Sequence, residues 1–283
     1  MTMERDTRAK ELFQDLVENG SMEEQLSGGP KEVIRPHISE LPFRVNEAIN
    51  ILRGNIQMSG YNLKAIAITS ALAHEGKSSI AFRLAKSMAG LEKRVLYMDC
   101  DIRNSITQSR YQITGKYKGL SEYLCGDVRK ERIIYRTDDP WMDIVFAGAT
   151  APNPSELVSG ALFRELMSYV RKQYSYIIVD TPPLNAVIDG LLVAKQCDGA
   201  ILVVESGLTE RAQAEKARQQ LMYADIKILG AVLNKAEAGH GHGYGYGYGY
   251  GYGYGYGHNK EDGDSQGEGT SGRKKKRKHK RKK

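Results

Sequence analysis

The chain of 283 residues contains 41 lysines and arginines against 34 aspartates and glutamates, which gives a formal net charge of +7. Ten of these basic residues lie in the last eleven positions, Arg273 to Lys283; without them 31 basic residues face 34 acidic ones, a balance of about −3. The body of the chain is therefore slightly acidic and carries a cationic end, which argues against a basic nucleic-acid-binding protein, and no specific nucleic-acid partner is expected.

Cysteine usage and hydropathy exclude further classes. Cys100, Cys125 and Cys197 are widely spaced and odd in number, so they form neither a disulfide framework nor a zinc pattern, and they indicate a reducing compartment. No apolar run approaches the roughly 18 to 20 residues that a membrane-spanning helix needs, and the charged first residues lack the apolar stretch of a signal peptide. A cytoplasmic protein is therefore expected.

The first 236 residues are predicted to form an N-terminal arm followed by one folded domain. Residues 1–42 are polar and are predicted to form an N-terminal arm with one short helix. In residues 43–236, apolar runs rich in β-branched residues alternate with amphipathic stretches, which predicts a three-layer α/β/α domain with a mostly parallel sheet. The predicted strands are 64–70, 94–99, 142–147, 176–180, 200–205 and 227–234, and the predicted helices are 78–89, 155–173, 186–196 and 210–223.

The rest of the chain changes in composition. Residues 237–258 contain a Gly-Tyr repeat flanked by histidines, and residues 259–283 form an acidic spacer and the basic tail. Glycine at every second position makes an ordered backbone costly, so both regions are predicted to be disordered. Alone, this composition would indicate an adhesive low-complexity segment, or weak metal binding through His240, His242 and His258. The tyrosines of the repeat are Tyr244, Tyr246, Tyr248, Tyr250, Tyr252, Tyr254 and Tyr256.

A phosphate-binding loop follows the first predicted strand. Gly76-Lys77-Ser78 closes a Walker A loop at a helix start, where backbone N–H groups and the helix dipole favour β- and γ-phosphates. Lys77 supplies a positive charge to these phosphates, and Ser78 supplies a hydroxyl to Mg²⁺. The motif has Ala71 at its usual first glycine and His74 where glycine is common, and a helix cap with a surface lysine is the alternative. The predicted nucleotide-binding residues are His74, Glu75, Gly76, Lys77, Ser78 and Ser79.

Three aspartates follow two further apolar strands. Asp180 ends the strand 176–180 before Thr-Pro-Pro, which is the Walker B form, and it can hold Mg²⁺ through water. Asp99 and Asp101 follow the strand 94–99 in an Asp-x-Asp-x-Arg motif. Parallel strands end at one edge of a sheet, so the three carboxylates are expected to converge on the phosphate-binding loop, and one remains free to accept a proton. A strand-capping Asp180 and a solvated Asp101 are the alternatives.

Together, the Walker A loop, the Asp-x-Asp-x-Arg motif (Walker A′), the Asp-Thr-Pro-Pro Walker B and the tyrosine cluster resemble the bacterial tyrosine kinases (BY-kinases) of capsule and exopolysaccharide export, in their stand-alone cytoplasmic form. The resemblance covers residues from about 38 to 256. It implies a protein-tyrosine kinase that uses ATP and Mg²⁺ to phosphorylate the tyrosine cluster of a neighbouring protomer. It assigns catalytic roles to Lys77, Asp99, Asp101 and Asp180, with Asp99 as the proton acceptor, and metal roles to Ser78, Asp101 and Asp180.

The resemblance also implies partners. In the family a helix with the motif Glu-x-x-Arg-x-x-Arg mediates assembly, and here the matching residues are Glu47, Asn50 and Arg53, so Asn50 replaces the middle arginine and the oligomer size stays open. A transmembrane activator on a separate chain and a location at the inner face of the cell membrane are expected. The basic tail could contact anionic lipid there, with a solvated tail or nonspecific RNA contact as alternatives.

Asn234 falls where related ATPases contact adenine, although a turn residue at a strand end would give the same pattern. Partition and division ATPases share this P-loop architecture and provide the rival interpretation, an ATP-dependent assembly switch. They usually carry a second lysine five residues before the P-loop lysine, but Leu72 occupies that position here. They also lack an acceptor tail, so radiolabel on the tyrosine cluster separates the two functions.

Overall fold

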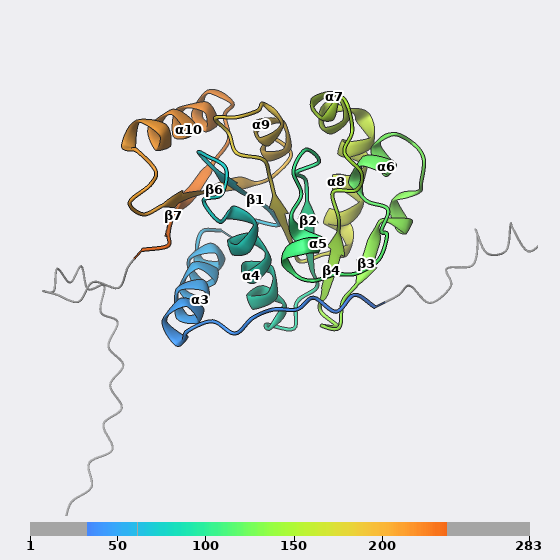
Figure 1. The fold of residues 1–283 in the computed structure, drawn as a ribbon, viewed down its shortest axis with the longest axis horizontal. Coiled ribbons are helices and arrows are strands. Elements are labelled where there is room, and N and C mark those ends of the chain that lie inside the picture. The colour runs from blue at the N-terminus through green and yellow to red at the C-terminus, as the bar shows by residue number, and fades with distance from the viewer. Residues whose placement is uncertain (1–32, 61, 237–283) are drawn as a thin grey trace, which may run out of the picture. The chain divides into compact units, whose positions relative to one another are not determined.

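The computed structural model describes residues 33–60 and 62–236 of the chain (Figure 1). The predicted tyrosine cluster, 237–258, and the predicted spacer and basic tail, 259–283, lie outside the described residues. None of the helices in the described part is long and apolar enough to cross a membrane.

The described residues form one seven-stranded sheet in the order β3-β4-β2-β5-β1-β6-β7. All neighbouring strands in it are parallel except β3 and β4. The central strands β1 and β2 are buried at every position, which explains why they appear in the sequence as unbroken apolar runs rather than as alternating ones. The strands are β1 Ala65–Ser70, β2 Val95–Asp99, β3 Ile134–Arg136, β4 Met142–Val145, β5 Tyr176–Asp180, β6 Gly199–Glu205 and β7 Ile228–Asn234.

Helices cover both faces of this sheet, which confirms the predicted three-layer α/β/α class (Figure 1). On one face, α3 and α4 pack over strand residues such as Ile66 and Ile68; on the other, α8, α9 and α10 pack over their neighbours Ala65 and Ala67. The helices are α3 Phe43–Met58, α4 Lys77–Ala89, α5 Thr107–Arg110, α6 Leu120–Leu124, η1 Lys130–Arg132, α7 Pro154–Ser159, α8 Ala161–Gln173, α9 Asp189–Ala194 and α10 Arg211–Tyr223.

Several predicted boundaries differ from the structure. The predicted helix 155–173 is two helices, because Gly160 between α7 and α8 is extended, with φ −69° and ψ 172°. The strand β3 was not predicted, because it has only three residues and pairs antiparallel at the sheet edge. The folded unit also reaches back to Val33, ten residues before the predicted start at 43: Ile34 is buried, and its N–H donates to the carbonyl of Arg136 at 2.9 Å.

Asp198 connects the start of β1 to helix α8 through hydrogen bonds. Its Oδ2 accepts the N–H groups of Lys64 and Ala65, each at 2.8 Å, and Arg171 Nη1 donates to its carboxylate at 2.9 Å. Burial acts to raise the pKa of Asp198, but the bonds from Arg171 and the two backbone groups outweigh it and hold the pKa below its ordinary value. The ionised carboxylate therefore stabilises the fold.

We expect Asp198→Asn to lower the free energy of unfolding by about 2 kcal/mol at pH 7, because the hydrogen bonds to a charged acceptor are weakened or lost. A lowered carboxyl pKa contributes stability above the unfolded value of about 4 and loses it as pH falls further. The difference from the wild type should thus shrink between pH 5 and pH 3 in urea unfolding. The exposed Asp127, replaced by asparagine, is the matched control, and an equal loss in both variants would contradict the assignment.

Candidate active site

The loop between β1 and α4 has the backbone geometry of a phosphate cradle. His74, with φ 68°, and Gly76, with φ 92°, are both in the left-handed region, and α4 begins directly after Gly76 at Lys77. The glycine slot occupied by His74 is thus a strained position for a side-chain-bearing residue. The first N–H groups of α4 have no partner within the helix, so they and the helix dipole form an anion site.

Four side chains stabilise this loop through hydrogen bonds: Glu75 within it, and Thr209, Asn234 and Lys235 from later in the chain. The carboxylate of Glu75, which is fully buried, accepts the N–H of Leu72 at 2.7 Å and also the hydroxyl of Thr209. Asn234 Nδ2 donates to the Glu75 carbonyl at 2.8 Å, and Lys235 Nζ donates to the His74 carbonyl at 3.2 Å. The Glu75 side chain therefore braces the loop, and only its backbone is placed to meet phosphate.

We expect Gly76→Ala to disable the loop. A Cβ at this position would lie 2.1 Å from Asn234 Nδ2, and φ +92° is a conformation that alanine adopts at a cost of about 1–2 kcal/mol. Asn234 would have to leave the Glu75 carbonyl, so nucleotide affinity should fall at least about tenfold, as measured with a fluorescent nucleotide. Gly54→Ala, where the added Cβ meets nothing within 4 Å, is the control and should keep wild-type affinity. Equal affinity in both variants would contradict the prediction.

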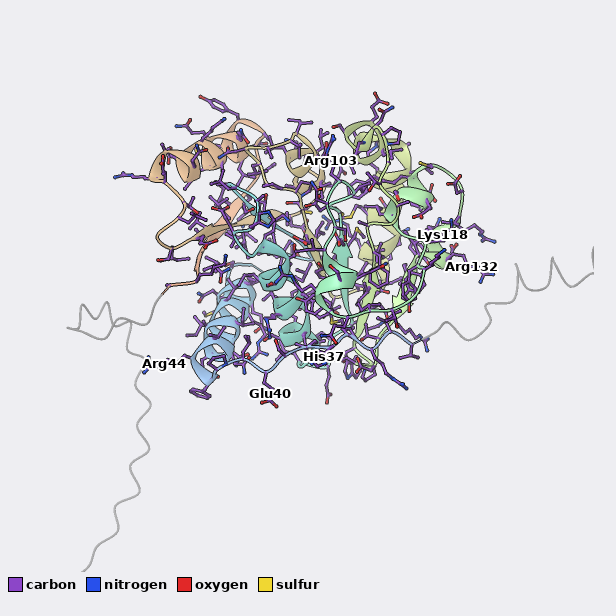
Figure 2. All side chains as sticks on the ribbon, in the orientation of Figure 1. His37, Glu40, Arg44, Arg103, Lys118 and Arg132 are labelled. Carbon is purple, nitrogen blue, oxygen red and sulfur yellow. The ribbon has the colours of Figure 1, made fainter. Side chains whose placement is uncertain are left out.

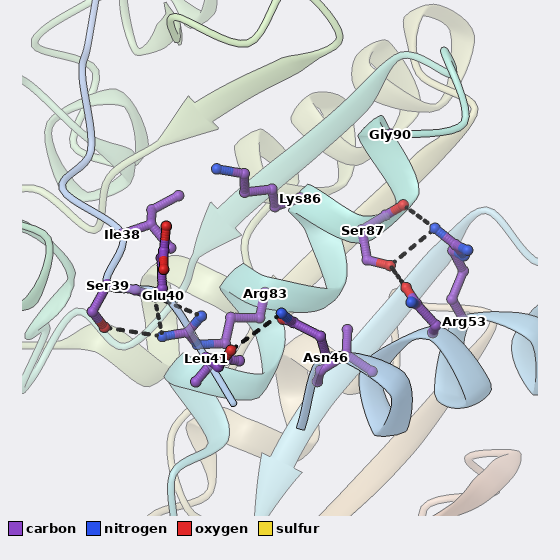
Figure 3. A pocket seen from close by; sticks show the side chains of 12 residues that line it. Ile38, Ser39, Glu40, Leu41, Asn46, Arg53, Arg83, Lys86, Ser87 and Gly90 are labelled. Atoms are coloured by element: carbon purple, nitrogen blue, oxygen red, sulfur yellow. Dashed lines mark hydrogen bonds between the residues drawn. The ribbon is translucent and has the colours of Figure 1, made fainter. Parts of the chain in front are cut away.

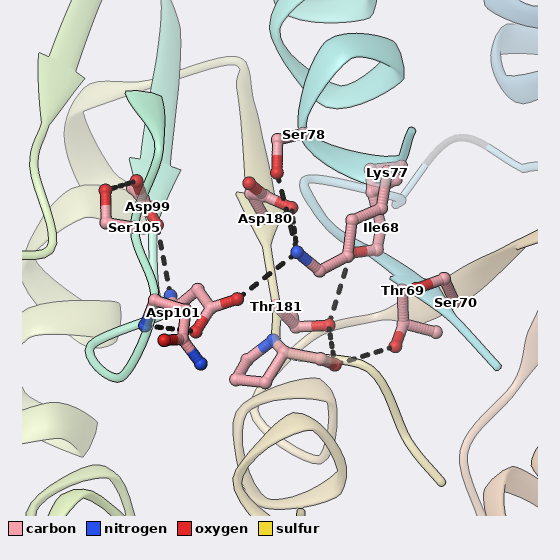
Figure 4. A network of polar contacts seen from close by, with 12 residues as sticks. Ile68, Thr69, Ser70, Lys77, Ser78, Asp99, Asp101, Ser105, Asp180 and Thr181 are labelled. Carbon is pink, nitrogen blue, oxygen red and sulfur yellow. Dashed lines mark hydrogen bonds and ion pairs between the residues drawn. The ribbon is translucent and has the colours of Figure 1, made fainter. Parts of the chain in front are cut away.

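The predicted carboxylates converge on Lys77 (Figure 4). Lys77 Nζ lies 3.2 Å from Asp101 Oδ2 and 4.0 Å from Asp180 Oδ1, and it donates to Ser78 Oγ at 3.5 Å. The cause is the sheet order: β5 lies between β1 and β2, and Asp99 is directly opposite Asp180 in the parallel register. The three aspartates therefore lie together at one edge of the sheet, as expected for residues at the ends of parallel strands.

The charges of this cluster are unbalanced. Burial acts to lower the pKa of Lys77, but Asp180 and Asp101 outweigh it and raise the pKa, so the lysine stays protonated. Burial, together with Asp99 and against the opposing effect of Lys77, raises the pKa of Asp180 to about 7. Three buried or nearly buried carboxylates therefore share one cation, and the cluster favours a further positive charge.

The residues present fit Mg²⁺. Asp180 Oδ1 is buried without a hydrogen-bond partner, and Ser78, at the start of α4, provides a hydroxyl beside it. In the described part of the chain no three acidic, histidine or cysteine side chains form a metal-binding group by themselves. Mg²⁺ is usually held by one or two carboxylates together with substrate phosphates, so Ser78 and Asp180 with a nucleotide form the expected type of site.

Asp99 is held more tightly than the sequence suggests. Its Oδ2 accepts the hydroxyls of Ser105 and Thr107, each at 2.6 Å, and its Oδ1 accepts the N–H of Asp101 at 3.0 Å. Burial raises the pKa of Asp99 although these bonds act to lower it. Of roughly four acceptor positions on a carboxylate, one remains for a substrate hydroxyl.

Comparison with known proteins gives the family. The family model described as "AAA domain" matches residues 63–207. The tyrosine-protein kinase CpsD of Streptococcus agalactiae serotype III (strain NEM316) is 39% identical over 192 residues, covering 68% of this chain and 83% of that protein. The tyrosine-protein kinase YwqD of Bacillus subtilis (strain 168) is 34% identical over 191 residues, covering 67% of this chain and 80% of that protein. The chain belongs to the bacterial tyrosine-protein kinase family.

Solved structures agree with this family. The kinase domain of the Escherichia coli tyrosine kinase ETK superposes with a TM-score of 0.64 at 26% identity, covering 78% of this chain and 98% of that one. The septum site-determining protein MinD of Pyrococcus horikoshii, complexed with Mg-ADP, superposes with a TM-score of 0.52 at 22% identity, covering 60% of this chain and 69% of that one. At this identity the likeness to MinD shows the fold alone, whereas the tyrosine-protein kinases above show the family.

The last residue of the kinase's Walker A′ motif, Arg103, is half-buried and pairs with the buried carboxylate of Asp189. Arg103 Nε donates to Asp189 Oδ2 at 2.6 Å, and Ser155 donates to the same carboxylate. These residues connect the loop after β2 with α9 and α7, and Figure 2 shows Arg103 on the side of the kinase opposite His37. Sequence reasoning found Arg103 as part of a motif but not its partners, because Asp189 and Ser155 belong to no recognised local pattern.

The predicted oligomer residues on α3 are engaged within the chain. Arg53 Nη1 donates to the Ser87 carbonyl at 2.7 Å, and Ser87 Oγ donates to Asn50 Oδ1 at 3.1 Å; Asn50 Nδ2 donates to Glu47 Oε1 at 3.1 Å. These contacts attach α3 to α4 at one end of a groove of about 570 Å³ that also borders residues 38–41 (Figure 3). A role of Glu47 and Arg53 in assembly stays a prediction.

Proposed function

We propose that this chain is an ATP-dependent protein-tyrosine autokinase that phosphorylates its C-terminal tyrosine cluster and thereby regulates capsule or exopolysaccharide biosynthesis and export. The observation that carries the proposal is Lys77, held at the start of α4 between the carboxylates of Asp101 and Asp180. A P-loop lysine, a helix N-terminus and strand-end acids form the machinery of phosphoryl transfer, and relatives with 34–39% identity are tyrosine-protein kinases.

The N–H groups of residues 74–79 would bind the phosphates of ATP, and Lys77 would turn from the carboxylates to the β- and γ-phosphates. Ser78 and Asp180 would hold Mg²⁺, with Asp101 beside them. Mg²⁺ bound there supplies positive charge to the phosphate oxygens during transfer. Asn234, which already donates a hydrogen bond to the loop, would contact the adenine base of the nucleotide.

The transfer step itself requires a proton acceptor. The tyrosine oxygen forms a bond to the γ-phosphorus, the bond from that phosphorus to the β–γ bridging oxygen breaks, and ADP takes the bond's electrons. The tyrosine proton passes to Asp99, because burial raises the pKa of this carboxyl and so favours its uptake of a proton. Ser105 and Thr107 keep that carboxylate in place.

The tyrosine cluster provides the substrate. A disordered chain of about 20 residues, which the composition of the cluster predicts, would have a root-mean-square span near 25 Å and a reach of roughly 70 Å, enough to enter the site of a neighbouring protomer. Tethering raises the local concentration of acceptor hydroxyls toward the millimolar range. Assembly into a homo-oligomer, a transmembrane activator on a separate chain and a position at the inner face of the cell membrane complete the proposal.

The test is transfer between two defective chains. A full-length Lys77→Met chain supplies an intact tyrosine cluster, and a chain truncated after Ala236 supplies an intact site. Mass spectrometry after incubation with ATP and Mg²⁺ should find phosphate on Tyr244–Tyr256 of the Lys77→Met chain only when both are present. Unlabelled tyrosines in the mixture, with nucleotide hydrolysis intact, would favour the assembly-switch interpretation instead.

A further inference from the structure

The buried hydroxyl of Tyr97 contacts Asp180, the carboxylate proposed to hold Mg²⁺. Tyr97 lies on β2 and is fully buried, with its ring edge-on to Phe82 at a centroid distance of 5.1 Å. Its hydroxyl donates to Asp180 Oδ2 at 3.2 Å and lies 3.0 Å from Thr107 Oγ1. The hydroxyl therefore lies between Thr107 and Asp180 and gives its single proton to Asp180.

The strand register explains why Tyr97 reaches Asp180. Tyr97 is opposite Ile178 on β5, and Asp99, two residues further along β2, is opposite Asp180. Residues two apart on a strand share a face, and diagonal neighbours on adjacent strands lie within reach of an aromatic side chain. Tyr97 thus extends toward the strand end, where its hydroxyl meets Asp180.

The two oxygens of Asp180 have different surroundings. Oδ2 accepts the Tyr97 hydroxyl, whereas Oδ1 is buried, lacks a hydrogen bond and lies 4.0 Å from Lys77 Nζ. A carboxylate without the Tyr97 bond could rotate about its last torsion, because such sp³–sp² torsions are broad. The Tyr97 bond therefore selects the rotation that presents Oδ1 to the phosphate-binding loop.

We propose that Tyr97 is a positioning residue of the kinase: its hydroxyl holds Asp180 so that Oδ1 faces the Mg²⁺ of a bound nucleotide. This inference rests on the metal role of Asp180 given under the proposed function. Groups that hydrogen-bond to metal-binding side chains orient them, and their loss typically weakens metal affinity about tenfold or more. Phenylalanine would keep the ring packing and remove only the bond.

The test measures metal-assisted nucleotide binding rather than turnover. The dissociation constant of a fluorescent ADP analogue is determined with excess EDTA and at rising Mg²⁺, for the wild type, Tyr97→Phe, Tyr123→Phe and Asp180→Asn. Tyr123 is the matched control, because its ring is buried and its partly buried hydroxyl also donates one bond of 3.2 Å, to the Leu162 carbonyl in the helix layer on the other face of the sheet. Thermal unfolding of each variant reports any general loss of packing.

Tyr97→Phe should shift the Mg²⁺ midpoint about tenfold upward while leaving ADP affinity in EDTA unchanged, and Tyr123→Phe should match the wild type in both. A wild-type midpoint in Tyr97→Phe, or an equal shift in Tyr123→Phe, overturns the positioning role. A wild-type midpoint in Asp180→Asn instead refutes the metal role on which the inference rests. If Tyr97→Phe fails to fold, Thr107→Val removes the hydroxyl beside Tyr97 together with one bond to Asp99, and Ser105→Ala removes only a bond of the same length to Asp99. Thr107→Val should then give a larger upward shift than Ser105→Ala, and equal shifts would count against the proposal.

Discussion

Replacing Lys77 with methionine is expected to reduce phosphorylation of the tyrosine cluster at least about a hundredfold, because the γ-phosphate loses its closest fixed cation. The same change should also destabilise the metal-free protein. Asp101 and Asp180 are 5% and 1% exposed, and without the ammonium group they would be buried beside each other with no counter-charge. Breaking such a buried pair costs about 3 kcal/mol.

Two measurements check this prediction: γ-labelled phosphate on the cluster, and urea unfolding in EDTA at pH 8 and pH 6. The loss of stability should be smaller at pH 6, because Asp180, whose pKa burial already raises to about 7, can take up a proton there. Lys86→Met on the same helix is the control, since the Lys86 side chain makes no hydrogen bond or ion pair with any described residue. A Lys77→Met protein as stable as the Lys86→Met protein would show that the cluster is not organised around this cation.

Asp180→Asn is expected to have the opposite effect on stability. Activity should fall at least about a hundredfold, because the neutral amide binds Mg²⁺ poorly, yet the metal-free protein should gain about 2 kcal/mol at pH 8. The reason is that Asp180 is buried beside Asp99 and Asp101 with only Lys77 to compensate, and removing one of three like charges relieves the repulsion. A substitution that abolishes activity but stabilises the metal-free protein is expected where a site binds an additional cation.

The pH dependence follows from the raised pKa of Asp180, about 7 against an unfolded value of 3.8. Between these values the native state keeps a proton that the unfolded state has lost, so wild-type stability falls as pH rises through this window. Asparagine does not titrate. The advantage of Asp180→Asn in EDTA should therefore grow from pH 4 to pH 7 and level off above it, with the exposed Asp127→Asn as control. A constant difference across this range would contradict the assignment.

The fold could be predicted where the sequence pattern follows from burial on both faces. The strands at Ala65–Ser70, Val95–Asp99 and Tyr176–Asp180 were predicted to within one residue, because an unbroken apolar run has few other stable placements. The break between α7 and α8 was not predicted, since it depends on an extended Gly160 that the surrounding packing selects. For the same reason the burial of Ile34 was missed: a single apolar residue in a polar stretch carries no periodic signal.

The candidate site divides in a similar way. The convergence of Asp99, Asp101 and Asp180 on Lys77 could be predicted, because strand ends of a parallel sheet share one edge. The brace from Thr209 to Glu75 could not, since it joins positions 134 residues apart without a motif. Nor could the unequal roles of the aspartates be predicted, because hydrogen-bond partners such as Ser105 and Thr107 are selected by the fold of the loop.

The sequence by itself determined the layer architecture, the phosphate-binding loop, the acids at the strand ends and the family, because these depend on local patterns of hydrophobicity and spacing. Only the tertiary structure decided which oxygen of Asp180 is free, which residue holds it and which side chains brace Glu75. Those properties arise from distances of a few ångströms between side chains on different elements. The order of the strands and the packing of α4 against them set such distances, and no local stretch of sequence encodes them.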